Sequence, residues 1–103
     1  MIRHCVLMKF KSDISEAERQ RLYAQIQALQ NHLTGWQGFI AGANINPETG
    51  MDKGYNGGFI IDFLDEKSHL AYLADAQHQE VGAQLVVAAQ DGLEGIMVFD
   101  FKF

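Results

Sequence analysis

The sequence is poor in cysteine, in clustered positive charge and in long apolar runs. Cys5 is the single cysteine among 103 residues, so an internal disulfide is excluded. The net charge is −5, and Lys and Arg gather only in the short stretches 9–11 and 19–21. A surface that follows nucleic-acid phosphates needs the opposite charge balance. No apolar stretch approaches the roughly 20 residues that span a bilayer, so we expect neither a nucleic-acid nor a membrane partner.

The N-terminal segment also lacks the features of a signal peptide. Arg3, His4 and Lys9 interrupt it, and it contains neither a continuous apolar stretch nor a cleavage site of small residues. We therefore expect a cytoplasmic location.

Motifs that bind phosphates or metal ions are missing as well. The glycines between positions 54 and 58 precede a strand-like segment and not a helix start, so they cannot form a phosphate-binding loop. His69, Asp75 and His78 come nearest to a set of metal ligands, but their spacing matches no strong zinc signature. The sequence therefore predicts neither a metal nor a cofactor.

The two terminal segments, 2–11 and 95–103, carry the strongest positive signal. Both alternate with the two-residue period of a strand, and both are apolar on each of their faces. The elements between them give the order βαββαβ, and the short length limits the chain to one domain, residues 1–103. Right-handed connections then place the helices on one face of a four-stranded antiparallel sheet. The predicted fold is an α+β, ferredoxin-like subunit.

Local signals indicate where several elements begin and end. Ser15, with Glu18 three residues later, is a capping box at a helix start. Gly35 lies where a helix can stop in a left-handed conformation, and Gly38 indicates a bulge or bend. Asp65 can cap a second helix. The predicted strands cover 2–11, 36–46, 55–63 and 95–103, and the predicted helices cover 16–33, 66–74 and 78–89.

One face of this sheet has no helix to cover it, although its residues are apolar. An exposed apolar patch of this size is a solubility hazard, which favours burial against a second copy of the chain. We therefore predict a homodimer through sheet-to-sheet packing. Its interface residues are Cys5, Leu7, Met97, Phe99 and Phe101, with Ile60 as an addition.

Several short motifs occur in an order and spacing typical of one family. They are the opening residues 2–11, the helix through Leu33, Gly42-Ala43-Asn44, the pair Tyr72 and His78, and the closing Phe99-Asp100. By these motifs the chain resembles the stress-responsive A/B barrel domain family, which is similar to the wider group of dimeric α+β barrels. The resemblance implies two ferredoxin-like subunits that pack sheet against sheet.

The resemblance also implies a site. In a cofactor-independent cyclase of this family, a tyrosine and a histidine six residues later act together, and a histidine of the first strand lines the same cavity. These catalytic roles would fall on Tyr72, His78 and His4, with a small apolar or aromatic ligand and chemistry of the cyclase, lyase or isomerase type. The expected pocket-lining residues are Val6, Met8, Leu22, Tyr23, Phe59, Ile61 and Val98.

The chain departs from the family pattern at two places. Asp75-Ala76-Gln77 stands where the family often has His-Pro, and Gly57 stands where the cyclase has a further cavity histidine. A glycine at that position predicts a roomier or differently shaped cavity.

Two alternative functions remain open at this stage. In the first, His4, Tyr72 and His78 are only buried polar groups of a structural or ligand-sequestering dimer that is not an enzyme. The second is a cofactor-free monooxygenase that uses Trp36 and Tyr72. Asp100 interrupts the apolar last strand, and we expect a structural polar contact there, for example with His4.

Overall fold

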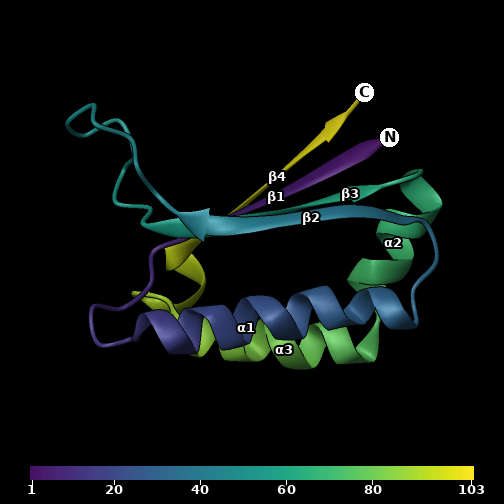
Figure 1. The fold of residues 1–103 in the computed structure, drawn as a ribbon, viewed down its shortest axis with the longest axis horizontal. Coiled ribbons are helices and arrows are strands. Elements are labelled where there is room, and N and C mark those ends of the chain that lie inside the picture. Colours follow the sequence, from purple (N-terminus) through teal and green to yellow (C-terminus); the bar gives the residue numbers. More distant parts are fainter.

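The computed structural model describes all 103 residues and shows a sheet covered by helices on one face (Figure 1). The strands are antiparallel in the order β2-β3-β1-β4, which confirms the predicted ferredoxin-like fold. None of the helices combines the length and hydropathy needed to span a lipid bilayer. The elements are β1 (Ile2–Met8), α1 (Glu16–Ala28), β2 (Trp36–Ala43), β3 (Gly57–Phe63), α2 (Glu66–Ala74), α3 (Ala76–Ala88) and β4 (Ile96–Lys102), with 3-10 turns at Leu29–Asn31 and Gly92–Gly95.

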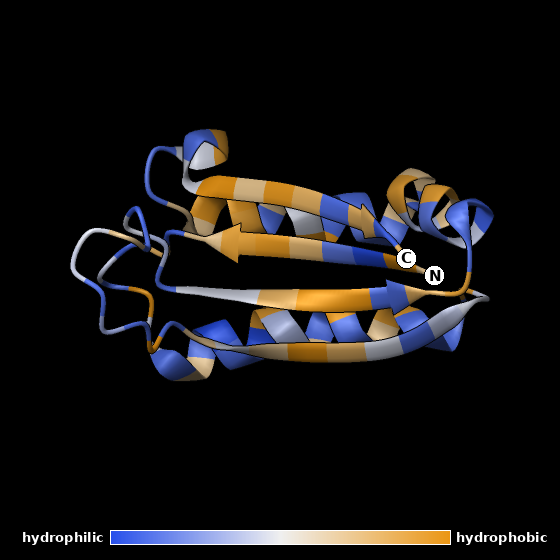
Figure 2. Cartoon of the chain, turned by 90° about the horizontal axis from the view of Figure 1, so that it is seen from above, coloured by the Kyte–Doolittle hydropathy of each residue, from blue (hydrophilic) through white to orange (hydrophobic).

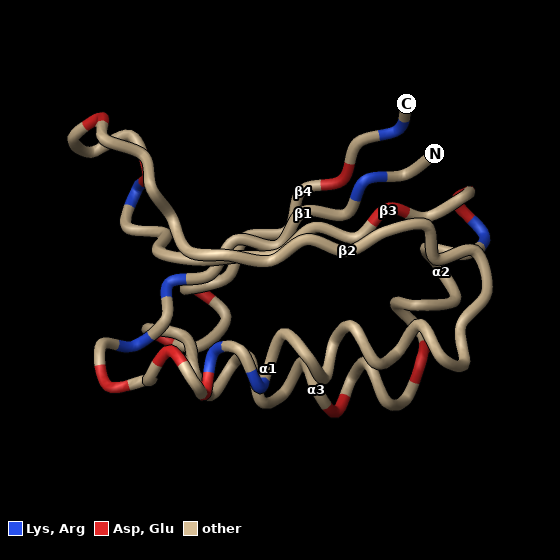
Figure 3. The backbone as a smooth tube through the Cα atoms, viewed as in Figure 1, with Lys and Arg blue, Asp and Glu red and all other residues tan.

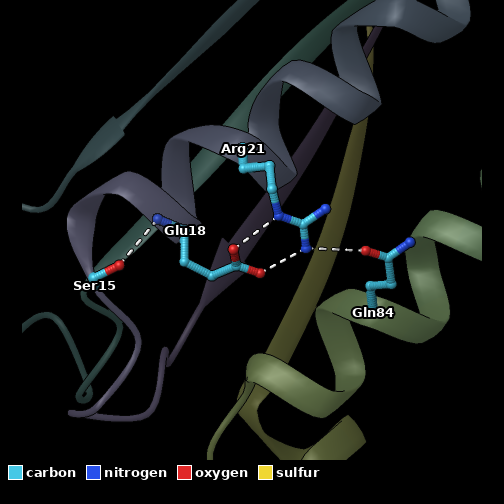
Figure 4. A network of polar contacts seen from close by, with 4 residues as sticks. All are labelled: Ser15, Glu18, Arg21 and Gln84. Atoms are coloured by element: carbon cyan, nitrogen blue, oxygen red, sulfur yellow. Dashed lines mark hydrogen bonds and ion pairs between the residues drawn. The ribbon is translucent and has the colours of Figure 1, made fainter.

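The start of α1 carries the predicted capping residue. The Ser15 side chain accepts a hydrogen bond from the Glu18 amide at 3.1 Å. The Glu18 carboxylate in turn accepts two hydrogen bonds from Arg21, at 2.6 and 2.8 Å. Arg21 also donates to Gln84 of α3 at 3.2 Å, so one surface network ties α1 to α3 (Figure 4).

Two aspartates cap the N-termini of α2 and α3, the helices that follow β3. The Asp65 carboxylate accepts a hydrogen bond from the Ser68 amide at 2.8 Å, and the Asp75 carboxylate accepts one from the His78 amide at 2.9 Å. Asp75 has an extended backbone, so the chain changes direction between α2 and α3. The second of these helices therefore begins at Ala76, two residues before the predicted start.

The first strand is shorter than predicted, because it ends at Met8 and not at Lys11. The Asn56 side chain accepts a hydrogen bond from the Phe10 amide at 2.8 Å and donates one to the Phe10 carbonyl at 2.9 Å. These two bonds take the backbone groups that a strand neighbour would use. β3 directly follows Asn56 in the chain and accordingly begins only at Gly57.

The core lies between the sheet and the helices. His4 on β1 stands opposite Ile61 on β3 and Asp100 on β4, so these three residues share the face towards the helices. A shift of register between Trp36 and Gly38 confirms the predicted bulge in β2. The largest fully buried side chains are Tyr72, Phe10, Phe63, Met8, Leu22, Ile26 and Ile61.

The opposite face of the sheet has no helix over it and is apolar. Cys5 stands opposite Ile60 and Phe99, and Leu7 stands opposite Met97. Figure 2 looks onto this face and shows hydrophobic residues along the middle of the strands. In Figure 3 the charged residues lie mainly at the end of the sheet near the two chain termini, in the loops and on the helices. A hollow of about 520 Å³ lies here, beside the loop after β2.

Candidate functional site

The first candidate residue, His4, is buried on β1 and paired with a carboxylate. Its ring is 2% exposed, and its Nδ1 lies 2.7 Å from Oδ1 of Asp100 on β4. Burial lowers the pKa of His4, although the Asp100 carboxylate acts in the opposite direction. A neutral ring beside this carboxylate donates its Nδ1–H to it, which leaves Nε2 with a lone pair. The expected polar contact between His4 and Asp100 is present.

Tyr72 of α2 and His78 of α3 lie against each other under the same part of the sheet. Their ring centroids are 4.0 Å apart with an interplanar angle of 36°. The Tyr72 ring also lies 5.3 Å from that of His4. The structure therefore brings together all three residues that sequence reasoning selected as candidates for catalysis.

This part of the molecule also collects polar atoms that have no partner within the chain. Tyr72 Oη, His78 Nδ1 and the indole Nε1 of Trp36 are buried and make no hydrogen bond. The Trp36 and Tyr72 ring centroids are 6.0 Å apart and those of Tyr72 and His78 are 4.0 Å apart, so the three rings form one cluster. Each unsatisfied buried group costs roughly 1–3 kcal/mol, so three such groups on neighbouring rings call for a partner outside the chain, such as water or a ligand.

The protonation states within the cluster are set by burial. Desolvation, assisted by the negative charge of Asp100, raises the pKa of Tyr72, so the phenol keeps its proton at neutral pH. Desolvation lowers the pKa of His78, although the nearby Leu73 carbonyl and the Asp75 charge act in the opposite direction, so its imidazole is neutral at neutral pH. The pair therefore combines a hydrogen-bond donor with a ring that can accept a proton.

Sequence reasoning missed the place of His69 in this site. Its ring lies 5.3 Å from that of His4, and its Nε2 lies 3.4 Å from the Asp100 carboxylate. The helical period could have indicated this position, because His69 and Tyr72 are three residues apart and share one face of α2. The set of His69, Asp75 and His78 does not converge, since Asp75 caps α3 and pairs with His32 at 2.8 Å.

The sequence matches the Stress responsive A/B Barrel Domain family over residues 2–103. The chain belongs to this family. No curated protein matches it.

Solved structures share the A/B barrel domain's fold over nearly its whole length. A dimeric ferredoxin-like protein of unknown function from Jannaschia sp. CCS1 is 26% identical, with a TM-score of 0.89 and coverage of 99% of this chain and 98% of that chain. The hydroxynitrile lyase of Passiflora edulis is 20% identical (TM-score 0.80, coverage 97% and 90%). SnoaB, a cofactor-independent oxygenase from Streptomyces nogalater, is 13% identical (TM-score 0.75, coverage 99% and 91%).

In this A/B barrel domain most of the predicted pocket-lining residues lie in the hydrophobic core. Val98 differs from them, because it faces the same side as Val6 on the edge strand and is 53% exposed. The other six are almost fully buried: Val6, Met8, Leu22, Tyr23, Phe59 and Ile61.

The prediction that Gly57 makes the cavity roomier is wrong. A Cβ atom at this position would lie 2.8 Å from Tyr23 Oη and 3.1 Å from the Phe10 ring. These two side chains fill the space that the missing side chain leaves, because Tyr23 of α1 and Phe10, two residues after β1, pack over β3 at this point. The unpartnered polar atoms lie instead at the other end of the layer, around Tyr72.

The two buried tyrosines of the A/B barrel domain are expected to respond oppositely to loss of the hydroxyl. Tyr23 Oη accepts a hydrogen bond from the Gly58 amide at 3.0 Å, so Tyr23→Phe should lower the free energy of unfolding by about 0.5–1.5 kcal/mol. Tyr72→Phe should leave it unchanged or raise it, since the Tyr72 hydroxyl is buried without a partner. Urea unfolding of both variants checks the contrast. A larger loss for Tyr72→Phe than for Tyr23→Phe would contradict it.

Proposed function

We propose that this protein is a homodimer that binds a small, partly apolar carbonyl compound beside Tyr72 and His78 and moves a proton on it. The observation that carries the proposal is the cluster of unpartnered buried atoms: Tyr72 Oη, His78 Nδ1 and Trp36 Nε1. A ligand with polar atoms at one end and an apolar body suits these groups, because the surrounding side chains are aromatic.

The chemistry follows from what each group can do. The protonated phenol of Tyr72 donates a hydrogen bond to the carbonyl oxygen and stabilises the negative charge that develops on it. The neutral ring of His78 removes a proton from the neighbouring carbon or hydroxyl and returns it later. His4, held by Asp100, lies edge-on to the Tyr72 ring at 5.3 Å between centroids. Trp36 and His78 are only half-buried, and both rings pack against the buried Tyr72 ring.

The dimeric state is supported by the uncovered sheet face. Burial of about six apolar side chains contributes on the order of 10–15 kcal/mol, which is comparable to the estimated 4–15 kcal/mol cost of association. The Jannaschia protein, which shares the fold over nearly the whole chain, is described as dimeric. Sheet-to-sheet packing leaves the helix side, and with it Tyr72 and His78, free to receive the ligand.

Two of the similar proteins support an enzymatic role over simple binding. One is a lyase that acts on hydroxynitriles and another is an oxygenase that needs no cofactor, so side chains of this fold can supply the chemistry. In the present chain, a lyase, cyclase or isomerase step fits the donor and base at Tyr72 and His78 better than an oxygenation does.

Trp36 provides a direct test, because it is the only tryptophan and lies 6.0 Å from Tyr72. Benzaldehyde and acetophenone should quench its fluorescence in a saturable manner. Tyr72→Phe and His78→Gln should each weaken this binding about tenfold, the effect of one lost hydrogen bond of about 1.4 kcal/mol.

Tyr23→Phe is the matched control, since it removes the other buried phenol hydroxyl at the far end of the core. It should bind both probes as tightly as the wild type. Quenching that does not saturate, or affinities that stay the same in Tyr72→Phe and His78→Gln, would sink the proposal.

A further inference from the structure

We propose that His4, His69 and Asp100 form a binding site for a single divalent transition-metal ion, with Zn²⁺ as the best fit. This inference does not rest on the proposed function, because neither Tyr72 nor His78 supplies a ligand atom, although His4 borders both sites. The three residues come from β1, α2 and β4 and meet where these elements pack together.

The distances suit one ion. His4 Nδ1 lies 2.7 Å from Asp100 Oδ1, His69 Nε2 lies 3.4 Å from Asp100 Oδ2, and the three ligand atoms all lie within 4.8 Å of one another. A tetrahedral zinc ion with bonds of 2.0–2.2 Å separates its ligand atoms by about 3.4 Å. Small side-chain rotations therefore convert the present arrangement into a coordination shell.

His69 gives an independent indication of a ligand. It is 9% exposed, and its Nε2 is buried without a hydrogen bond although the Asp100 carboxylate lies only 3.4 Å away. A metal ion bound to both His69 Nε2 and the Asp100 carboxylate would give this nitrogen the partner that it lacks. The ion would take the place of the proton that His4 Nδ1 now donates to Asp100, and that proton moves to Nε2.

The donor set selects the class of metal. Two imidazoles and one carboxylate suit zinc and neighbouring transition metals, whereas Mg²⁺ and Ca²⁺ prefer oxygen ligands alone. Two neutral rings and one carboxylate also leave the bound ion with a net positive charge. Because the Asp100 side chain is 35% exposed on the edge strand, solvent can reach the ion, and a water or ligand atom can complete its shell.

Calorimetric titration of the chelator-treated protein with ZnCl₂ tests the proposal. The wild type should bind one Zn²⁺ per chain, and the bound ion should raise the melting temperature. His69→Gln and Asp100→Asn should each weaken binding at least about tenfold, by analogy with losses at supporting positions of metal sites.

His32→Gln is the matched control. It removes the protein's other close His–Asp pair, His32 with Asp75 at 2.8 Å, which belongs to no set of three potential metal ligands. Zn²⁺ binding should be unchanged in this variant and in Tyr72→Phe, so loss of the organic-ligand site and loss of the metal site are distinguished. Absence of Zn²⁺ binding in the wild type, or equal binding by wild type, His69→Gln and Asp100→Asn, would overturn the proposal.

Co²⁺ provides a readout that does not depend on any variant. In the wild type it should show the intense visible absorption of a four-coordinate nitrogen and oxygen site. A pale spectrum of the six-coordinate aqueous type under the same conditions would count against the site.

Discussion

A Phe99→Asp variant is expected to sediment as a folded monomer of 11.5 kDa at micromolar concentration, whereas the wild type is expected to sediment at about twice that mass. Phe99 is 56% exposed on the uncovered face, on the edge strand β4, and packs edge-on against Phe101 with ring centroids 4.8 Å apart. Loss of its burial removes about 3 kcal/mol of association free energy, or roughly a hundredfold in affinity. A carboxylate buried between two apolar sheets adds a desolvation cost to this.

Val87→Asp is the control for the Phe99 variant. Val87 is 71% exposed on α3, on the helix side of the molecule, so the same kind of change there should leave the mass unchanged. Leu7→Asp, on the sheet face opposite Met97, should repeat the Phe99 result. If Phe99→Asp and Leu7→Asp both stayed dimeric while circular dichroism showed them folded, the sheet-to-sheet interface would be excluded.

Gly57→Ala is expected to lower the free energy of unfolding by about 1–3 kcal/mol, as overpacking of a filled core does. The added methyl group meets Tyr23 Oη at 2.8 Å and the Phe10 ring at 3.1 Å. Tyr23 cannot move away freely, because its hydroxyl holds the Gly58 amide. For a domain of this size the melting temperature should fall by about 4–8 °C per kcal/mol, which calorimetry can measure.

Gly42→Ala is the matched substitution for this test. Gly42 lies on the neighbouring strand β2, and a Cβ atom there has no heavy atom within 4 Å. Its stability should change little. A Gly57→Ala protein as stable as Gly42→Ala would show that space does remain above Gly57, as the sequence alone had suggested.

Much of the fold could be predicted because its signals are local. The side-chain caps at Ser15 and Asp65 depend only on residues within one turn, and both hydrogen bonds are present. The two-residue alternation of β1 likewise decides which face His4 takes. The end of β1 was placed too late, because the bonds between Phe10 and Asn56 join residues 46 positions apart.

The candidate site could likewise be predicted only in part. Tyr72 and His78 could be selected from the family resemblance, and the structure places their rings 4.0 Å apart. The surroundings of Gly57 could not be predicted, since Tyr23 arrives from another element. His69 was missed for a related reason: its neighbour Asp100 lies on the last strand, and no spacing in the sequence links the two.

The sheet order has a consequence for how the chain is made. β1 lies between β3 and β4, and the amino-terminal nitrogen of Met1 donates a hydrogen bond to the carbonyl of Phe103 at 2.9 Å. During synthesis the first strand leaves the ribosome long before its last neighbour, so one edge of β1 keeps open hydrogen-bonding groups until β4 emerges. A chain truncated before β4 would therefore keep an unpaired strand edge on β1, which is a template for aggregation.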